Sequence, residues 1–220
     1  MSITESNRFS DIFKWESEGS NRYSRQAVSV ATTQSLSVGE VIGRNDRYAD
    51  TVTYAAGNTG DNAAAFTLGT GAKIGTYKAV CSANKTAGSE TWNVYDPNGA
   101  WLGTATTGVT FTNTAVQVVI STGTTTAATT NDTIYMPVSR TEGSVGELSF
   151  SATDGKQYAY GVMAETKTTG KTSLTSVAVV RDATVSRTNL VWPSGATDAQ
   201  KLKALEELRE RGIVYDRVQV

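Results

Sequence analysis

Two glycine-bearing stretches have residue types that could bind phosphate. GTGAKIG at residues 69–75 has the glycine density of a phosphate-binding loop, but it lacks the GK[ST] ending and lies between two expected strands. Phosphate-binding loops instead open a helix. TGKTS at residues 169–173 is a fragment of such a loop without the upstream glycine at the required spacing. We interpret both stretches as turns between strands.

Three side chains could ligate calcium, and one could act as a nucleophile. Asp96, Asn98 and Asp132 carry suitable oxygens, but no D-x-[DN]-x-[DN]-G loop is present and turn formation explains all three. Cys81 is the single cysteine, so no internal disulfide can form. It is interpreted as a small buried strand residue rather than as a nucleophile. There is no histidine, which excludes Ser–His and Cys–His catalysis and histidine metal sites.

The overall composition argues against several other classes of protein. The 220 residues include 21 acidic and 20 basic ones, a net charge of −1, whereas nucleic-acid binders usually carry a basic excess. No apolar run is long enough to cross a bilayer, and the N-terminus lacks the pattern of a secretory signal. No carboxylate pair lies in a recognisable catalytic setting. We therefore expect no enzymatic activity, no cofactor, no metal, and no nucleic-acid or membrane partner.

Residues 47–141 differ from the rest of the chain in composition: they are rich in Thr, Gly, Ala and Asn and poor in charged residues. Short β-runs recur between turn signals, which predicts an inserted antiparallel, sandwich-like β domain. Asp96-Pro97-Asn98-Gly99 fits a type I turn and predicts a hairpin. The expected strands are TVTYAA, AAFTLG, GTYKAVC, TWNVYD, AWLGTAT, VTFTN, AVQVVIS and TIYMPVS.

Four aromatic residues of this region leave two interpretations open. Trp92, Trp101, Tyr77 and Tyr95 could stack on sugars, or they could fill the core of the β domain. We favour the core. Along the strands, Val109 and Phe111, then Val116, Val118 and Ile120, then Ile134, Met136 and Val138 alternate with polar residues, which predicts one buried and one solvated face.

Residues 31–46 and 142–220 predict a small mixed β core with one C-terminal helix, so the fold class is mainly β (α+β). Strands are expected at 35–46, 147–151, 158–164 and 175–181. The helix is expected at 197–211. Thr197 and Gln200 form a capping box, and Gly212 ends the helix. Its apolar stripe is expected to be Leu202, Leu205 and Leu208, extended by Ala199.

Residues 1–30 are polar with isolated large apolar side chains, and QAVSV at 26–30 alternates like a strand. The alternatives are a disordered leader and an arm that becomes ordered on a partner. We favour the arm, because exposed aromatic residues in a disordered leader invite aggregation. The residues expected to anchor the arm on its partner are Phe9, Ile12, Phe13 and Trp15. The family resemblance described below adds the segment with Tyr23, Ser24, Arg25, Val28 and Val30.

The chain resembles the head decoration protein D family of tailed bacteriophages. Four segments carry the resemblance: NRYSRQAVSV at 21–30, YAYGVMAE at 158–165, TSVAVVRDATVSRTNLVWP at 175–193 and ATDAQKLKALEELRERGIV at 196–214. The L-x-WP turn followed by a capped helix and GI is the most specific mark. It includes Trp192, Pro193, Thr197, Gln200 and Gly212, of which Trp192 and Pro193 are expected to fix the fold. The hairpin VYDPNGAWLG at 94–103 is similar to that of longer members, which makes residues 47–141 an insertion.

The resemblance implies a structural role without enzymatic activity or cofactor. It implies a homotrimer that binds the outside of the expanded capsid at three-fold and quasi-three-fold sites. The N-terminal arm would add a strand to the major capsid protein, and the trimers would stabilise the shell against DNA pressure. The expected location is the outer surface of the virion, after synthesis in the host cytoplasm. Neighbouring decoration trimers are a further expected contact. The competing interpretation is a carbohydrate-binding or adhesin β-sandwich.

Overall fold

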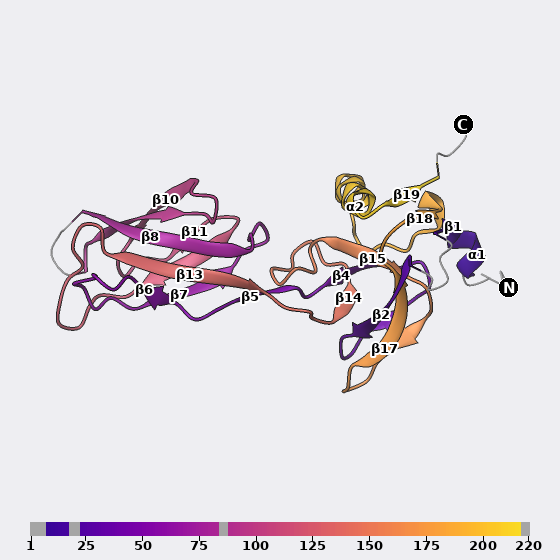
Figure 1. The fold of residues 1–220 in the computed structure, drawn as a ribbon, viewed down its shortest axis with the longest axis horizontal. Coiled ribbons are helices and arrows are strands. Elements are labelled where there is room, and N and C mark those ends of the chain that lie inside the picture. Colours follow the sequence, from indigo (N-terminus) through magenta and orange to yellow (C-terminus); the bar gives the residue numbers. More distant parts are fainter. Residues whose placement is uncertain (1–7, 18–22, 84–87, 217–220) are drawn as a thin grey trace. The chain divides into compact units, whose positions relative to one another are not determined.

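The computed structural model describes residues 8–17, 23–83 and 88–216. The chain forms two compact units (Figure 1). Unit 1 contains the residues up to Asp46 and those from Glu142 onward, and unit 2 contains Arg47–Thr141. Each unit has its own apolar core, and each is described by itself below.

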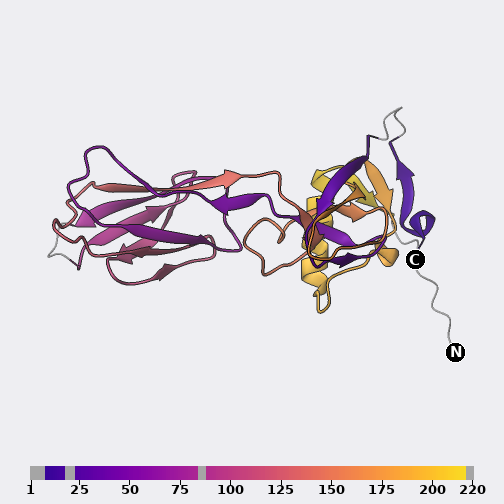
Figure 2. The ribbon, with the colours of Figure 1, turned by 90° about the horizontal axis from the view of Figure 1, so that it is seen from below.

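Unit 1 is built around a small closed barrel, seen from two directions in Figures 1 and 2. The strand order is β14-β2-β17-β15-β4, antiparallel except where β14 meets β2. β15 is buried along its whole length, as expected for a strand covered on both faces. The barrel strands are β2 (Arg25–Val30), β4 (Val41–Arg44), β14 (Val145–Glu147), β15 (Ala159–Met163) and β17 (Leu174–Val179).

A second sheet of unit 1 brings together distant parts of the chain. β18 (Ala183–Val185) is its centre, with β1 (Phe13–Glu16) antiparallel on one side and β19 (Ile213–Tyr215) parallel on the other. The short helix α1 (Phe9–Ile12) leads into β1, and the 3₁₀ turn η1 (Arg187–Asn189) follows β18. A two-stranded ribbon of β3 (Ser35–Leu36) and β16 (Lys167–Thr168) completes the strands of this unit.

The C-terminal helix α2 (Asp198–Glu210) begins where the capping box was predicted. Thr197 Oγ1 accepts a hydrogen bond from the Gln200 N–H at 3.3 Å, and Gln200 Oε1 accepts one from the Thr197 N–H at 2.9 Å. Gly212 follows the helix at φ +77°, where a Cβ atom would collide with Asp182.

The predicted apolar stripe of α2 was partly wrong. Leu205 and Leu208 are buried, but Leu202 is 48% exposed and Ala199 is also exposed. Ala204 is buried instead, so the buried face is rotated from the predicted one. Both buried leucines pack in the cluster that also holds Ile12 and Phe13.

Unit 2 consists of two antiparallel sheets around one apolar cluster. The larger sheet has the order β10-β9-β8-β13-β5, with β6 also paired to β13, and the smaller has the order β11-β12-β7. All eight predicted β-runs contain a strand. The strands are β5 (Arg47–Ala49), β6 (Thr53–Tyr54), β7 (Ala64–Leu68), β8 (Gly75–Ala83), β9 (Thr91–Tyr95), β10 (Trp101–Thr106), β11 (Phe111–Thr112), β12 (Val116–Ile120) and β13 (Thr133–Arg140).

The predicted alternation holds on β12 and β13: Val116, Val118 and Ile120, and Ile134, Met136 and Val138, are all buried. Val109 is an exception, because it precedes β11 in a turn and is 58% exposed. The strand predicted at 147–151 is also misplaced. β14 occupies Val145–Glu147, and the chain turns from Phe150 onward.

The acidic residues considered as calcium ligands organise turns. Asp96 Oδ1 accepts hydrogen bonds from the N–H groups of Asn98 at 2.9 Å and Ala100 at 2.8 Å, inside the predicted β9–β10 hairpin. The hydrogen bond from Lys73, at 2.6 Å, lowers the pKa of Asp96. Burial alone would raise the pKa of Asp132. Hydrogen bonds that its carboxylate accepts from the N–H groups of Gly60, Thr129 and Thr59 have the larger combined effect, so the pKa of Asp132 is lowered.

Candidate functional site

Five of the nine residues assigned to partner binding are buried in unit 1. Ile12 and Phe13 belong to the cluster with α2, and Val28 and Val30 belong to the barrel cluster. Ser24 is fully buried. The expectation that all nine belong to a partner-binding arm therefore needs correction, because Ile12, Phe13, Val28 and Val30 fill the core of unit 1 instead. Residues 1–7 and 18–22 lie outside the described residues.

The remaining four residues form a surface around β1, which we call the β1 surface: Phe9, Trp15, Tyr23 and Arg25. Trp15 is 56% exposed and Tyr23 is 55% exposed, so two large aromatic side chains face solvent from one part of unit 1. Phe9 is half-buried, stacked on Phe13 with ring centroids 4.3 Å apart. Exposed tryptophan and tyrosine side chains are typical of residues that anchor protein interfaces.

Arginine side chains stack on two aromatic rings of the β1 surface, those of Phe9 and Tyr23. The Arg25 guanidinium lies 4.5 Å from the centroid of the Phe9 ring and pairs with Glu16 at 2.8 Å. The Arg181 guanidinium lies 4.8 Å from the centroid of the Tyr23 ring. These contacts restrict the side chains before any partner arrives, which lowers the entropy lost on binding.

Ser24 fastens the β1 surface to the rest of unit 1. Its hydroxyl donates to the Asp182 carbonyl at 2.6 Å and accepts from the Ser17 N–H at 3.0 Å. Its own carbonyl accepts from the Val180 N–H at 2.9 Å. This role could not be predicted from the sequence, because a serine between Tyr23 and Arg25 has no spacing signal for burial.

β1 also offers a backbone edge. In the part of the chain that the structure describes, β1 pairs with β18 alone and lies at the edge of its sheet. A register shift between Phe13 and Trp15 marks an irregularity in the strand. The N–H and C=O groups of an edge strand can pair with an added strand from another chain.

The LVWP turn is held against β4. The Val41 N–H donates to the Val191 carbonyl at 3.0 Å, and the Val191 N–H donates to the Gly39 carbonyl at 2.9 Å. Trp192 is half-buried and packs against the cluster with α2. Because Trp192 packs there, the turn lies where it can position the start of α2.

Glu40 lies beside this turn. Burial raises the pKa of its carboxyl group, and the hydrogen bond from the Ser37 N–H at 2.8 Å partly opposes this change.

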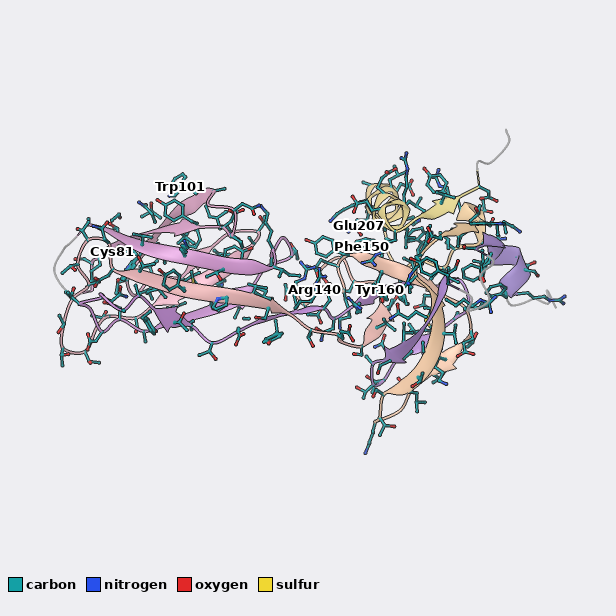
Figure 3. The ribbon with its side chains drawn as sticks, in the orientation of Figure 1. Cys81, Trp101, Arg140, Phe150, Tyr160 and Glu207 are labelled. Carbon is teal, nitrogen blue, oxygen red and sulfur yellow. The ribbon has the colours of Figure 1, made fainter. Side chains whose placement is uncertain are left out.

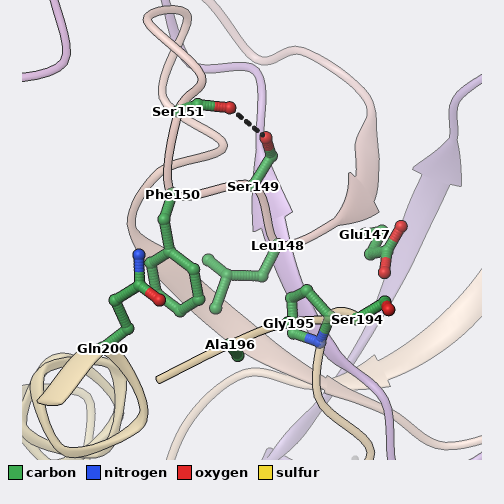
Figure 4. A pocket seen from close by; sticks show the side chains of 10 residues that line it. Glu147, Leu148, Ser149, Phe150, Ser151, Ser194, Gly195, Ala196 and Gln200 are labelled. Atoms are coloured by element: carbon green, nitrogen blue, oxygen red, sulfur yellow. Dashed lines mark hydrogen bonds between the residues drawn. The ribbon is translucent and has the colours of Figure 1, made fainter. Parts of the chain in front are cut away.

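A shallow groove of about 440 Å³ lies beside the same turn (Figure 4). Its lining includes Gln200 and Phe150, which lie near each other in Figure 4, together with Pro193, Ser149 and Ser151. The hydroxyls of the two serines are 3.5 Å apart. Glu147 is the one titratable residue among its lining residues. The groove thus has neither a paired acid and base nor a nucleophile with a base.

The described residues also bear on the other chemical possibilities. They contain no group of three or more His, Cys, Asp or Glu side chains placed to hold a metal ion. Cys81 is buried in the core of unit 2, and this burial raises the pKa of its thiol, which disfavours the reactive thiolate. No helix in the described ranges is long and apolar enough to cross a membrane.

A model of the family described as Bacteriophage lambda head decoration protein D matches residues 2–213. The chain belongs to this family. The decoration-protein family is one of structural phage capsid proteins, so the family role of the chain is phage head decoration. For the family, that role implies binding to the virion capsid.

Other comparisons add little to this assignment. No curated protein matches the chain. Two crystal structures of Xanthomonas campestris FlgL, in space groups H3 and C2, have TM-scores of 0.31 and 0.29 at 17% and 18% identity. The matches cover 50% and 55% of this chain, and 34% and 33% of the FlgL chains. The chain thus spans about a third of their length.

Proposed function

We propose that the protein is a capsid cement protein that binds as a homotrimer to the outside of the expanded phage head. The trimers occupy three-fold and quasi-three-fold sites and stabilise the shell against the pressure of packaged DNA. The family match over residues 2–213 carries this proposal. The β1 surface supports it, because it combines exposed aromatic residues with an available strand edge.

The proposed contact is strand addition between β1 or the residues preceding it and the sheet of the major capsid protein. Each added backbone hydrogen bond contributes only about 1 kcal/mol net. A trimer presents three such edges, and after the first has bound, the others bind at a high effective concentration. Weak individual contacts can thus give high occupancy, and a monomer is expected to bind poorly.

Deleting residues 1–20 would not test this contact cleanly. The deletion removes Ile12 and Phe13, which are 0% and 6% exposed, from the core of unit 1. A folding defect would then account for any loss of binding. Substitutions at exposed positions of the β1 surface avoid the problem.

We therefore expect the double variant Trp15→Ser with Tyr23→Ser to lose at least about tenfold in affinity for expanded heads, the loss typical of removing interface anchors. Co-sedimentation with heads that lack the decoration protein measures this. The matched control is Val109→Ser, which removes an apolar side chain, 58% exposed, from unit 2. Native occupancy by the double variant, with an unchanged oligomeric state, would refute the role of the β1 surface.

A further inference from the structure

The larger sheet of unit 2 has an outer face whose composition differs from its core face. Strand residues alternate, so the core face holds Tyr77 and Trp92, at 0% and 1% exposure. These two of the four aromatic residues considered for sugar stacking are therefore core residues. The other two, Trp101 and Tyr95, belong to the outer face, and Trp101 is 62% exposed.

The strand register aligns aromatic side chains in one row across four strands. Trp101 of β10 is paired with Tyr95 of β9, Tyr95 with Lys78 of β8, and Lys78 with Tyr135 of β13. Residues that are directly paired point to the same face. We call these four residues the aromatic row. Figure 1 shows β8 and β13 adjacent in unit 2, and Figure 3 labels Trp101 on β10.

The geometry of the row suits flat, ring-shaped groups. Neighbouring strands lie about 4.8 Å apart, so the two tyrosines, separated by β8, are roughly 10 Å apart. This separation is comparable to the length of a disaccharide. The Lys78 ammonium lies 5.9 Å from the centroid of the Tyr135 ring, so a single cation divides the aromatic surface. The row is therefore not one continuous apolar patch.

The positions beside the row supply hydroxyl and amide groups. Thr104 donates from Oγ1 to Asn93 Oδ1 at 3.2 Å, and Asn93 is paired through Val80 to Thr133 of β13. On the other side of the row, Thr76 is paired with Pro137. None of the positions named here or in the row carries a carboxylate, and Lys78 is the one charged residue among them. Asp50 lies beyond Pro137, and its carboxylate accepts a hydrogen bond from Ser139 at 2.9 Å.

We propose that the outer face of this sheet binds a neutral glycan chain. Sugar rings present C–H groups on their faces and hydroxyls at their edges. Aromatic rings attract the C–H groups of a sugar through their negative faces. Thr and Asn side chains can form hydrogen bonds with the sugar hydroxyls. A nucleic acid would require a cluster of basic residues rather than one lysine. A protein interface of standard size would require a continuous desolvated core, which Lys78 interrupts.

Affinity electrophoresis of the full chain tests this inference. Native gels would contain hydroxyethyl cellulose, galactomannan, mannan or dextran, and a fifth gel would contain acidic alginate. We expect at least one neutral polysaccharide to retard the protein. We expect Trp101→Ala and Tyr135→Ala each to reduce the apparent affinity at least tenfold. The control is Val119→Ala, which shortens an exposed apolar residue of β12, on the smaller sheet.

Three outcomes would overturn the inference. The first is the absence of retardation in every neutral gel together with no binding to an array of bacterial glycans. The second is equal retardation of native protein and Trp101→Ala, once circular dichroism shows the variant to be folded. The third is retardation by alginate alone that is lost in Lys78→Ala and kept in Trp101→Ala. The inference rests on unit 2 alone, so each outcome leaves the proposed head binding unaffected.

Discussion

Glu207, labelled in Figure 3, is a half-buried charged residue that links α2 to the barrel. Its Oε2 accepts a hydrogen bond from the Ala159 N–H of β15 at 2.7 Å, and Lys203 approaches Oε1 at 3.6 Å. Burial raises the pKa of Glu207, and the Ala159 N–H and Lys203 only partly oppose it. The folded state therefore holds the proton more tightly than the unfolded state does. Stability contributed by this group falls as pH rises from about 4.3, the usual glutamate value, through the higher folded pKa.

Replacing Glu207 with Gln tests this sign. The amide oxygen can still accept from the Ala159 N–H, but no charge is buried. We expect the free energy of unfolding of Glu207→Gln, relative to the native protein, to increase with pH between about 4.3 and neutrality. Urea unfolding over this range measures it. Glu206→Gln removes an exposed carboxylate from the same helix and corrects for the general change in charge. A difference that stays constant with pH after this correction would contradict the account.

Local turn and cap chemistry could be predicted from the sequence, whereas burial of single side chains could not. Thr197 and Gln200 formed their capping box, and Asp96 formed its turn, because both depend on residues a few positions apart. Ile12 and Trp15 are both large apolar residues near the N-terminus. One is 0% exposed and the other 56% exposed, because β18 and α2, more than 150 residues later, decide which side is covered.

At the scale of elements, the helix α2 was predicted correctly from the sequence, but the prediction of which of its faces is buried was partly wrong. Leucines at 202, 205 and 208 suggested one stripe, but spacing by three alone drifts around a helix of 3.6 residues per turn. Ala204, Leu205 and Leu208 satisfy the period better, and these are the buried residues. The smaller Ala204 lets α2 approach the cluster that it covers.

This orientation predicts unequal effects of two identical substitutions. Leu208→Ala removes a fully buried side chain and is expected to destabilise the protein by about 2–5 kcal/mol. Leu202→Ala, at 48% exposure, is expected to change stability by less than about 0.5 kcal/mol. Urea unfolding followed by the helical signal in circular dichroism compares the two variants. Equal losses of unfolding free energy in the two variants would mean that the buried face of α2 is assigned wrongly.

At the scale of the whole molecule, each unit has its own proposed function: head binding for unit 1 and glycan binding for unit 2. Unit 1 contains the family's L-x-WP turn and capped helix and the β1 surface, and its core is assembled from both ends of the chain. Unit 2 encloses a separate cluster and carries the aromatic row. The short alternating strands of unit 2 could be predicted, because each is a local pattern. The closed barrel of unit 1 could not, because all its strand pairs except β15–β17 join residues more than about 100 positions apart in the sequence.

The most direct test of head decoration is cryo-electron microscopy of expanded heads that lack the decoration protein, after mixing with the purified full chain. We predict added density at three-fold and quasi-three-fold sites, with unit 1 against the shell and β1 or the residues before it alongside a capsid-protein strand. Saturating amounts of folded protein that leave these sites empty would contradict the central claim. So would attachment to the shell through unit 2 alone.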